Sequence, residues 1–218
     1  WPSGPAAPSG PRPAPPRCTP PALRALLDGR AAHGERLHIV AHSMGAAAGL
    51  LLAERPPIPL ASFLNAEGNL IGSDCGLLSR RASEMTREEF LRKFPQLLQA
   101  AAASQDAGLR YWSASASRCS PAAFHAAAAS LVEWSDGGQL AERFLRLECR
   151  RLYLYGELSR NEEVLQMLGP RLPCRGLPDS GHFMTADAPE AFAREVADLV
   201  FPLAQGEAVT HQGTVSRA

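Results

Sequence analysis

The chain has 218 residues, of which 45% are hydrophobic, and its 22 basic residues balance its 22 acidic ones. This length predicts one domain, or one domain with an insertion, with enough apolar residues for a core. Zero net charge, and the lack of a basic run next to aromatic residues, argue against a nucleic-acid-binding protein. No apolar stretch approaches the ~18–20 residues that a transmembrane helix needs, so we expect no membrane span.

The cysteines show no close pair and no C-x-x-C motif, which argues against a metal cluster. We therefore expect free thiols and, since no basic segment with an apolar core begins the chain, a cytoplasmic location. The five cysteines are Cys18, Cys75, Cys119, Cys149 and Cys174.

Residues 1–21 consist mainly of Pro, Gly, Ala and Ser. Such a segment buries too little apolar surface to offset its ordering entropy, so we expect disorder there. The stretch 20–27 then has prolines ahead of leucines and alanines, which is typical of a helix start.

A run of strand formers begins at Leu37 and leads into Ser43, after which small helix formers follow. Ser43 has Ala41 two residues before it and Gly45 two residues after it. A strand that turns sharply into a helix needs small residues there and holds its central residue in a strained conformation. The alternative is an ordinary helix N-cap serine, but the whole pattern favours a catalytic nucleophile.

The segment Val40–Gly45 resembles the nucleophile elbow of the α/β-hydrolase family, in an Ala-x-Ser-x-Gly form. The resemblance implies an α/β fold, with a mainly parallel sheet flanked by helices, and a triad in the order serine, acid, histidine. It implies hydrolysis of an ester-like bond in a small-molecule acyl ester or related substrate, through an acyl-enzyme and without cofactor or metal. The backbone N–H of Met44 would stabilise the oxyanion. A serine nucleophile argues against the related dehalogenases and epoxide hydrolases, which attack with a carboxylate.

The catalytic base is predicted to be His182. It lies in a loop between a predicted strand at 171–177 and a helix that Pro189 opens, which matches the base of the family. His42 is next to the nucleophile, but its side chain should diverge from that of Ser43. The remaining histidines have no such setting and are expected to be structural or solvated: His33, His38, His125 and His211.

The acid of the triad has two possible locations in this family. The usual one follows the penultimate strand, predicted here at 151–156, but it is occupied by Ser159, which cannot supply a negative charge. The other follows the strand predicted at 60–66, where Glu67 stands beside a glycine. We prefer Glu67 and keep Glu157 as the second choice. Three further carboxylates stay open: Asp74, Glu162 and Glu163.

Several helices are predicted around these strands. The nucleophile helix should cover 46–55 and stop at Pro56-Pro57, and Thr86 should cap a helix at Arg87–Ala103. Ser120-Pro121 opens a helix at 122–134, and another follows at Gln139–Arg146. Four aromatic residues of this region either line a pocket or pack internally: Tyr111, Trp112, Phe124 and Trp134.

The helical block at 72–148 resembles the family's helical cap, which covers the active site. We therefore expect residues 22–71 and 149–205 to form a partial hydrolase core. The ends of the chain, 1–21 and 206–218, should be a disordered segment and a flexible tail.

The resemblance covers residues 22 to about 204. Family members normally have several strands before the nucleophile strand, and a His-Gly loop that supplies a second oxyanion donor. The 36 residues before Leu37 contain neither, although Trp1–Gly4 faintly resembles an early family loop. We therefore expect an N-terminally truncated fold with its first core strands missing, and with limited stability and little activity alone. This keeps two alternatives open: a catalytically inactive remnant or binding protein, and a triad that acts on a thioester or a carbon–carbon bond.

Overall fold

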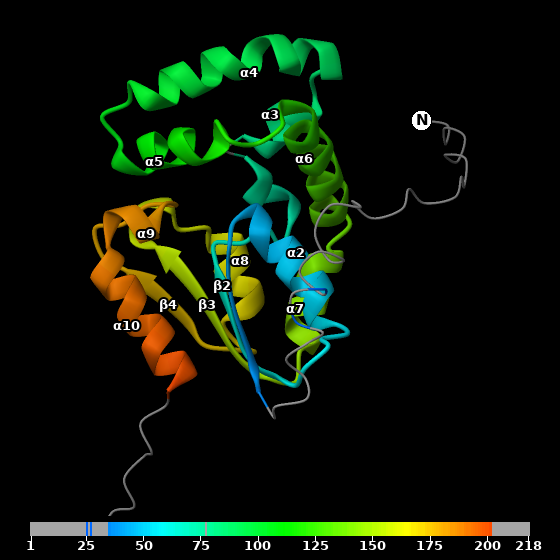
Figure 1. Cartoon of the computed structure of the whole chain (residues 1–218). Helices are drawn as coiled ribbons and strands as arrows, with labels where there is room; N and C mark the ends of the chain where they lie inside the picture. Colours follow the sequence, from blue (N-terminus) through cyan, green and yellow to red (C-terminus); the bar gives the residue numbers. More distant parts are fainter. Residues whose placement is uncertain (1–24, 26, 28–34, 77, 202–218) are drawn as a thin grey trace, which may run out of the picture.

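The computed structural model describes residues 25, 27, 35–76 and 78–201. Their four strands form one parallel sheet in the order β1-β2-β3-β4 (Figure 1). The strands are β1 (Leu37–His42), β2 (Leu60–Ala66), β3 (Arg150–Gly156) and β4 (Cys174–Leu177). With helices in every connection, this confirms the predicted α/β fold with a parallel sheet.

The helices divide into those that pack on the sheet and those that lie beyond its end. The first group is α2 (Met44–Ala53), α7 (Gln139–Arg146), α8 (Glu162–Leu168), α9 (Met184–Asp187) and α10 (Pro189–Val200). The second group is α3 (Ser79–Ser83), α4 (Arg87–Ala102), α5 (Ala107–Ala116) and α6 (Pro121–Asp136). Two short 3-10 turns, η2 (Gly72–Cys75) and η3 (Glu157–Ser159), follow β2 and β3.

Helices pack on both faces of the sheet. Neighbouring residues of a strand point to opposite faces, so each strand contributes side chains to both layers. In β2, Phe63 packs on the face that α2, α7 and α8 cover, whereas Leu64 packs on the face that α10 covers. Both side chains are fully buried. Burial on both faces explains the run of mostly apolar residues in the buried parts of the two central strands, β2 and β3.

The predicted elements agree with the structure except at their ends. The nucleophile helix begins at Met44 rather than at residue 46, because the chain turns from strand to helix at Ser43 alone. The last strand begins at Cys174 rather than at residue 171, since Pro173 has no N–H and contributes only its carbonyl, which accepts from the Tyr153 N–H at 3.1 Å.

Helices α3 to α6 lie beyond the carboxyl ends of the strands (Figure 1). Their side chains form a separate apolar cluster that includes Phe90, Phe94 and Phe124. The predicted N-cap residue Thr86 is present, and its Oγ1 accepts from Glu89 N at 3.2 Å. Ser120, which was predicted only to open a helix, also acts as an N-cap, because its Oγ accepts from Ala123 N at 3.4 Å. The position of these helices agrees with a cap, but the division of the chain at residues 72 and 148 stays a prediction.

Some expectations concern residues that the structure does not describe. The segment 1–21 and the tail 206–218 lie outside the described residues, as does the helix at 20–27 apart from Ala25 and Leu27. The expectation that the first core strands are missing also concerns this part of the chain and stays a prediction. The cysteines in the described part, Cys75, Cys119, Cys149 and Cys174, are free thiols. No described helix has both the length and the apolar character to cross a membrane.

Candidate active site

Ser43 is the single residue between β1 and α2, and its backbone is strained. It has φ 51° and ψ −131°, a region that costs a non-glycine residue about 1–3 kcal/mol. Its N–H donates to the carbonyl of Ala66 at 3.1 Å, which fixes the turn to the end of β2. The side chain makes no capping hydrogen bond to α2, so Ser43 is not an N-cap of the ordinary kind.

The small residues around this turn differ in how closely other atoms approach them. A Cβ on Gly49 would meet the Ala41 Cβ at 3.3 Å, so the helix can lie against the strand only because both residues are small. A Cβ on Gly68 would collide with Ala46 in the same way. At Gly45, however, a Cβ would meet no described atom within 4 Å apart from its chain neighbours and the backbone of its own helix. The steric reason predicted for that glycine is therefore wrong, and Gly45 instead lines the cavity described below.

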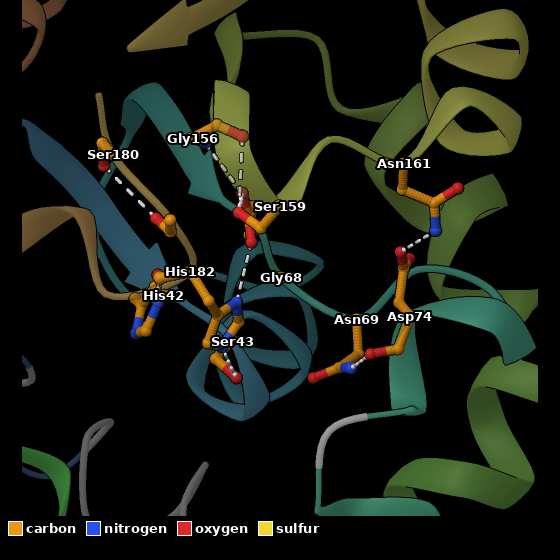
Figure 2. A network of polar contacts seen from close by, with 12 residues as sticks. His42, Ser43, Gly68, Asn69, Asp74, Gly156, Ser159, Asn161, Ser180 and His182 are labelled. Carbon is orange, nitrogen blue, oxygen red and sulfur yellow. Dashed lines mark hydrogen bonds and ion pairs between the residues drawn. The ribbon is translucent and has the colours of Figure 1, made fainter. Parts of the chain in front are cut away.

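Ser43, His182 and Glu67 form one chain of hydrogen bonds, in which Figure 2 labels Ser43 and His182. The Ser43 hydroxyl donates to His182 Nε2 at 3.0 Å, and His182 Nδ1 donates to Glu67 Oε2 at 2.8 Å. The three residues come from the ends of β1 and β2 and from the loop after β4. Because parallel strands end at the same edge of a sheet, residues 139 positions apart in the sequence meet here.

The Glu67 carboxylate is held from its other side as well. Its Oε1 accepts from the Gly156 N–H at 2.7 Å and from the Ser159 hydroxyl at 2.5 Å. Only 8% of Glu67 is exposed, so water does not replace these donors. Ser159, at the position where the family usually has its acid, thus donates to an acid that comes from another strand.

The other carboxylates considered from the sequence do not reach His182. Glu157 lies 3.6 Å from Arg160. Asp74 Oδ2 accepts from the N–H groups of Leu70 and Ile71, at 3.0 and 3.2 Å. Glu162 and Glu163 occupy the first turn of α8.

His42 contacts the loop of the predicted base. Its Nε2–H donates to the carbonyl oxygen of His182 at 2.8 Å, and the two rings lie 4.7 Å apart between centroids. Burial, followed by the proximity of His182, lowers the pKa of His42, which keeps its ring neutral. The sequence does not predict this contact, because nothing in the local pattern links residues 42 and 182.

The remaining histidines in the described part have structural partners. His38 Nδ1 lies 2.8 Å from Ser62 Oγ, and His125 Nε2 donates to the carbonyl of Met85 at 2.9 Å. His33 and His211 lie outside the described residues.

A cavity of about 420 Å³ opens at Ser43 and extends beneath α5 and α6. Three of the four aromatic residues considered from the sequence line it: Tyr111, Trp112 and Phe124. The fourth, Trp134, packs instead under the Arg143 guanidinium, 4.7 Å from the ring centroid. The cavity therefore has an aromatic wall next to a hydrogen-bonded serine.

Met44 is the first residue of α2 and lines the same cavity. The first N–H groups of a helix have no intrahelical acceptor and carry the positive end of the helix dipole. These N–H groups could donate hydrogen bonds to a negative charge that develops beside Ser43. The oxyanion role of Met44 remains a prediction.

Comparisons with known proteins identify the family and the fold of the chain. The sequence model of the alpha/beta hydrolase family matches residues 4–195, whereas comparison with curated proteins gave no match. MenH from S. aureus is 17% identical, with a TM-score of 0.56, over 83% of this chain and 73% of that chain. A thermophilic esterase from Thermogutta terrifontis is 17% identical, with a TM-score of 0.59, over 86% and 74%. A structure from a study of Nitrososphaera gargenis carboxylesterases is 16% identical, with a TM-score of 0.60, over 83% and 70%. Since the family match spans most of the chain, and since the sheet and the elbow have the family's arrangement, the protein belongs to the alpha/beta hydrolase family.

Proposed function

We propose that the protein is a serine hydrolase that cleaves an ester-like bond in a small-molecule acyl substrate. The observation that carries this proposal is the continuous hydrogen-bond chain from Ser43 through His182 to Glu67 at the edge of the cavity. The word esterase in the descriptions of two structural neighbours agrees with it. We keep a cytoplasmic location as part of the proposal.

The reaction follows from the direction of each hydrogen bond. Ser43 Oγ attacks the carbonyl carbon, while its proton passes to His182 Nε2. Glu67 holds His182 in the tautomer with Nδ1 protonated and stabilises the imidazolium that forms. The Met44 N–H faces the oxyanion of the tetrahedral intermediate.

The intermediate then collapses to an acyl-enzyme. The bond to the leaving alcohol breaks, and His182 Nε2 returns the proton to the departing oxygen. Water repeats the sequence on the acyl-enzyme, which releases the carboxylic acid and restores the Ser43 hydroxyl. Every step uses a side chain or a backbone group, so the proposal invokes no cofactor.

A fluorophosphonate probe tests the assignment, because it bonds covalently to an activated serine. We expect the wild-type protein to be labelled at Ser43 and Ser43→Ala to remain unlabelled with its fold intact. Ser117→Ala is a suitable control, since Ser117 is exposed and outside the cavity. Labelling that persists in Ser43→Ala would exclude this nucleophile. A folded wild-type protein that is never labelled would favour an inactive family member that only binds ligands.

A further inference from the structure

One end of the cavity is polar, and most of its groups have no role in the hydrogen-bond chain of the triad. We call it the polar arm. Its members come from the segment after β2, from β3 and from the N-terminus of α8: Asn69, Ser73, Asp74, Tyr153 and Asn161. In Figure 2, Asn69, Asp74 and Asn161 lie on one side of Ser43 and His42 lies on the other.

Two buried groups of the polar arm have hydrogen-bonding capacity that the described residues do not use. Asn69 is 4% exposed; its Nδ2 donates to the Asp74 carbonyl at 2.6 Å, but its Oδ1 has no partner. Tyr153 is 2% exposed, and no hydrogen bond holds its hydroxyl among the described residues. Buried polar groups are nearly always hydrogen-bonded in proteins, so the unpaired Asn69 Oδ1 indicates a ligand position, and Tyr153 lines the same cavity.

The other members of the arm support these two groups. Asn161 Nδ2 donates to Asp74 Oδ1 at 2.9 Å and to Ser73 Oγ at 3.2 Å. Asn161 Oδ1 caps α8 by accepting from Glu163 N and Val164 N. This network fixes the wall of the arm, so that its free groups keep one position.

The charge of the cavity limits what can bind. Its described lining contains the carboxylates Glu67 and Asp74 but no lysine or arginine. An anionic group would enter a buried site that already holds negative charge and has no cation to pair with it, which is unfavourable. Burial, followed by the charges of Asp74 and Glu67, raises the pKa of the Tyr153 hydroxyl, so it stays protonated and can donate.

The position of His182 indicates which part of a substrate lies in the arm. In the proposed reaction His182 protonates the leaving alcohol, so this alcohol must lie on the His182 side of Ser43. The Phe183 ring is 5.1 Å from the His182 ring and lines that side of the cavity. The acyl group then extends away from His182, toward Asn69 and Asp74.

We propose that the polar arm binds an uncharged hydrogen-bonding group in the acyl part of the substrate, and that the enzyme discriminates against anionic acyl groups. An amide fits the free groups best, because its N–H can donate to Asn69 Oδ1 and its carbonyl can accept from the Tyr153 hydroxyl. This inference rests on the proposed function, and it narrows the substrate to esters with a neutral polar acyl chain.

Three p-nitrophenyl esters with acyl chains of equal length test the proposal: the N-acetylglycinate, the pentanoate and the glutarate monoester. Each kcat/KM is divided by the second-order rate constant for attack of an external nucleophile, hydroxylamine, on the same ester, which corrects for the electrophilicity of the carbonyl carbon without including intramolecular attack by the carboxylate or the amide. We expect the N-acetylglycinate to exceed the pentanoate by about 25-fold, the product of two hydrogen bonds between uncharged groups worth about fivefold each. The anionic glutarate monoester should be the poorest substrate.

Tyr153→Phe removes only the hydroxyl, and Tyr155→Phe is its matched control. Tyr155 lies on the same face of β3 but outside the lining of the cavity. We expect Tyr153→Phe to lower the ratio of N-acetylglycinate to pentanoate turnover by about fivefold, the value of one such hydrogen bond. Tyr155→Phe should leave this ratio unchanged.

Fluorophosphonate labelling of each variant distinguishes a failure of the polar-arm inference from a failure of the proposed function. If Ser43 is labelled but the ratio does not change in Tyr153→Phe, or changes equally in Tyr155→Phe, the polar arm does not bind the acyl group. Preference for the glutarate monoester would also overturn the inference. If wild-type Ser43 is not labelled, the proposed function fails, and the inference fails with it.

Discussion

Replacing Glu67 with glutamine should reduce turnover strongly, because it removes the charge beside His182 and also changes the tautomer of His182. Gly156 N–H and Ser159 O–H both donate to Oε1, at 2.7 and 2.5 Å, so the amide of Glu67→Gln would place its oxygen there. Its NH₂ group would then face His182 Nδ1, which must become an acceptor. The proton of His182 would move to Nε2, where it would prevent His182 from accepting the proton of Ser43.

The expected loss can be estimated from the same change in another serine hydrolase. In a Ser-His-Asp triad, the corresponding acid-to-amide substitution costs about 10⁴ in kcat because it selects the wrong tautomer. The donors on Oε1 orient the amide in the same way here, so we expect a loss of this order for Glu67→Gln.

The assay is ester turnover by folded protein, with Glu157→Gln as the control. Glu157 lies on the same edge of the sheet, but its side chain lies 3.6 Å from Arg160 and it makes no hydrogen bond to His182. Glu157→Gln should lose less than tenfold. If Glu67→Gln keeps activity within tenfold of wild type, or if Glu157→Gln loses more, the assignment of the acid is wrong.

Three other changes test the surroundings of the triad. Ser159→Ala removes a hydrogen bond to a buried carboxylate, which is typically worth ~1.5–3 kcal/mol, so kcat should fall about tenfold or more; activity equal to wild type would contradict this. The pKa of His42 is lowered in the folded protein from its ordinary value of 6.5. Between this lowered pKa and pH 6.5, His42 therefore binds more protons in the unfolded chain than in the folded protein. The free energy of unfolding should therefore fall as the pH drops from 6.5 toward the folded-state pKa, and denaturant titrations should show a weaker decrease in His42→Gln. A Cβ at Gly156 would collide with the carbonyl oxygens of Ser180 and Gly181, so Gly156→Ala should displace the His182 loop. A misplacement of about 1 Å can cost 10²-fold in kcat, whereas unchanged kinetics would show that the loop adjusts freely.

Features that depend on local sequence could be predicted. The strand-serine-helix turn at Ser43 and the strand that ends before Glu67 follow from short patterns, and both occur in the structure. The sequence predicts Thr86 as a helix N-cap and a helix start at Ser120-Pro121, and in the structure both side chains accept a backbone N–H of the first helical turn. Such signals lie within a few residues of one another, so the sequence alone contains them.

Contacts between distant segments could not be predicted in this way. Ser159 lies 92 residues from Glu67, and His42 lies 140 residues from His182. Their hydrogen bonds depend on which strands become neighbours, and no local period reports that. The sequence does, however, contain the reason to prefer Glu67, because a serine at position 159 cannot supply the negative charge of the acid.

Helix α5 was missed for a different reason. Its sequence, Ala107–Ala116, is rich in alanine and serine, and its buried residues include Gly108 and Ser113 rather than large apolar side chains. Asp106 is the N-cap of this helix, and its Oδ1 accepts from Leu109 N at 3.1 Å. An aspartate alone does not predict a helix start when no apolar period follows it. Small residues are needed because a Cβ at Gly108 would collide with Phe183, beside the predicted base.

The central claim is that Ser43 carries the acyl group during turnover. The most direct measurement uses p-nitrophenyl acetate as the substrate. The reaction is stopped with acid during turnover, and the acetyl group is located by peptide mass spectrometry. The account predicts one acetylated residue, Ser43, in the wild-type protein, and no acetylation of Ser43 when His182 is replaced by alanine. Turnover with the acetyl group on another residue, or acetylation of Ser43 that does not depend on His182, would contradict it.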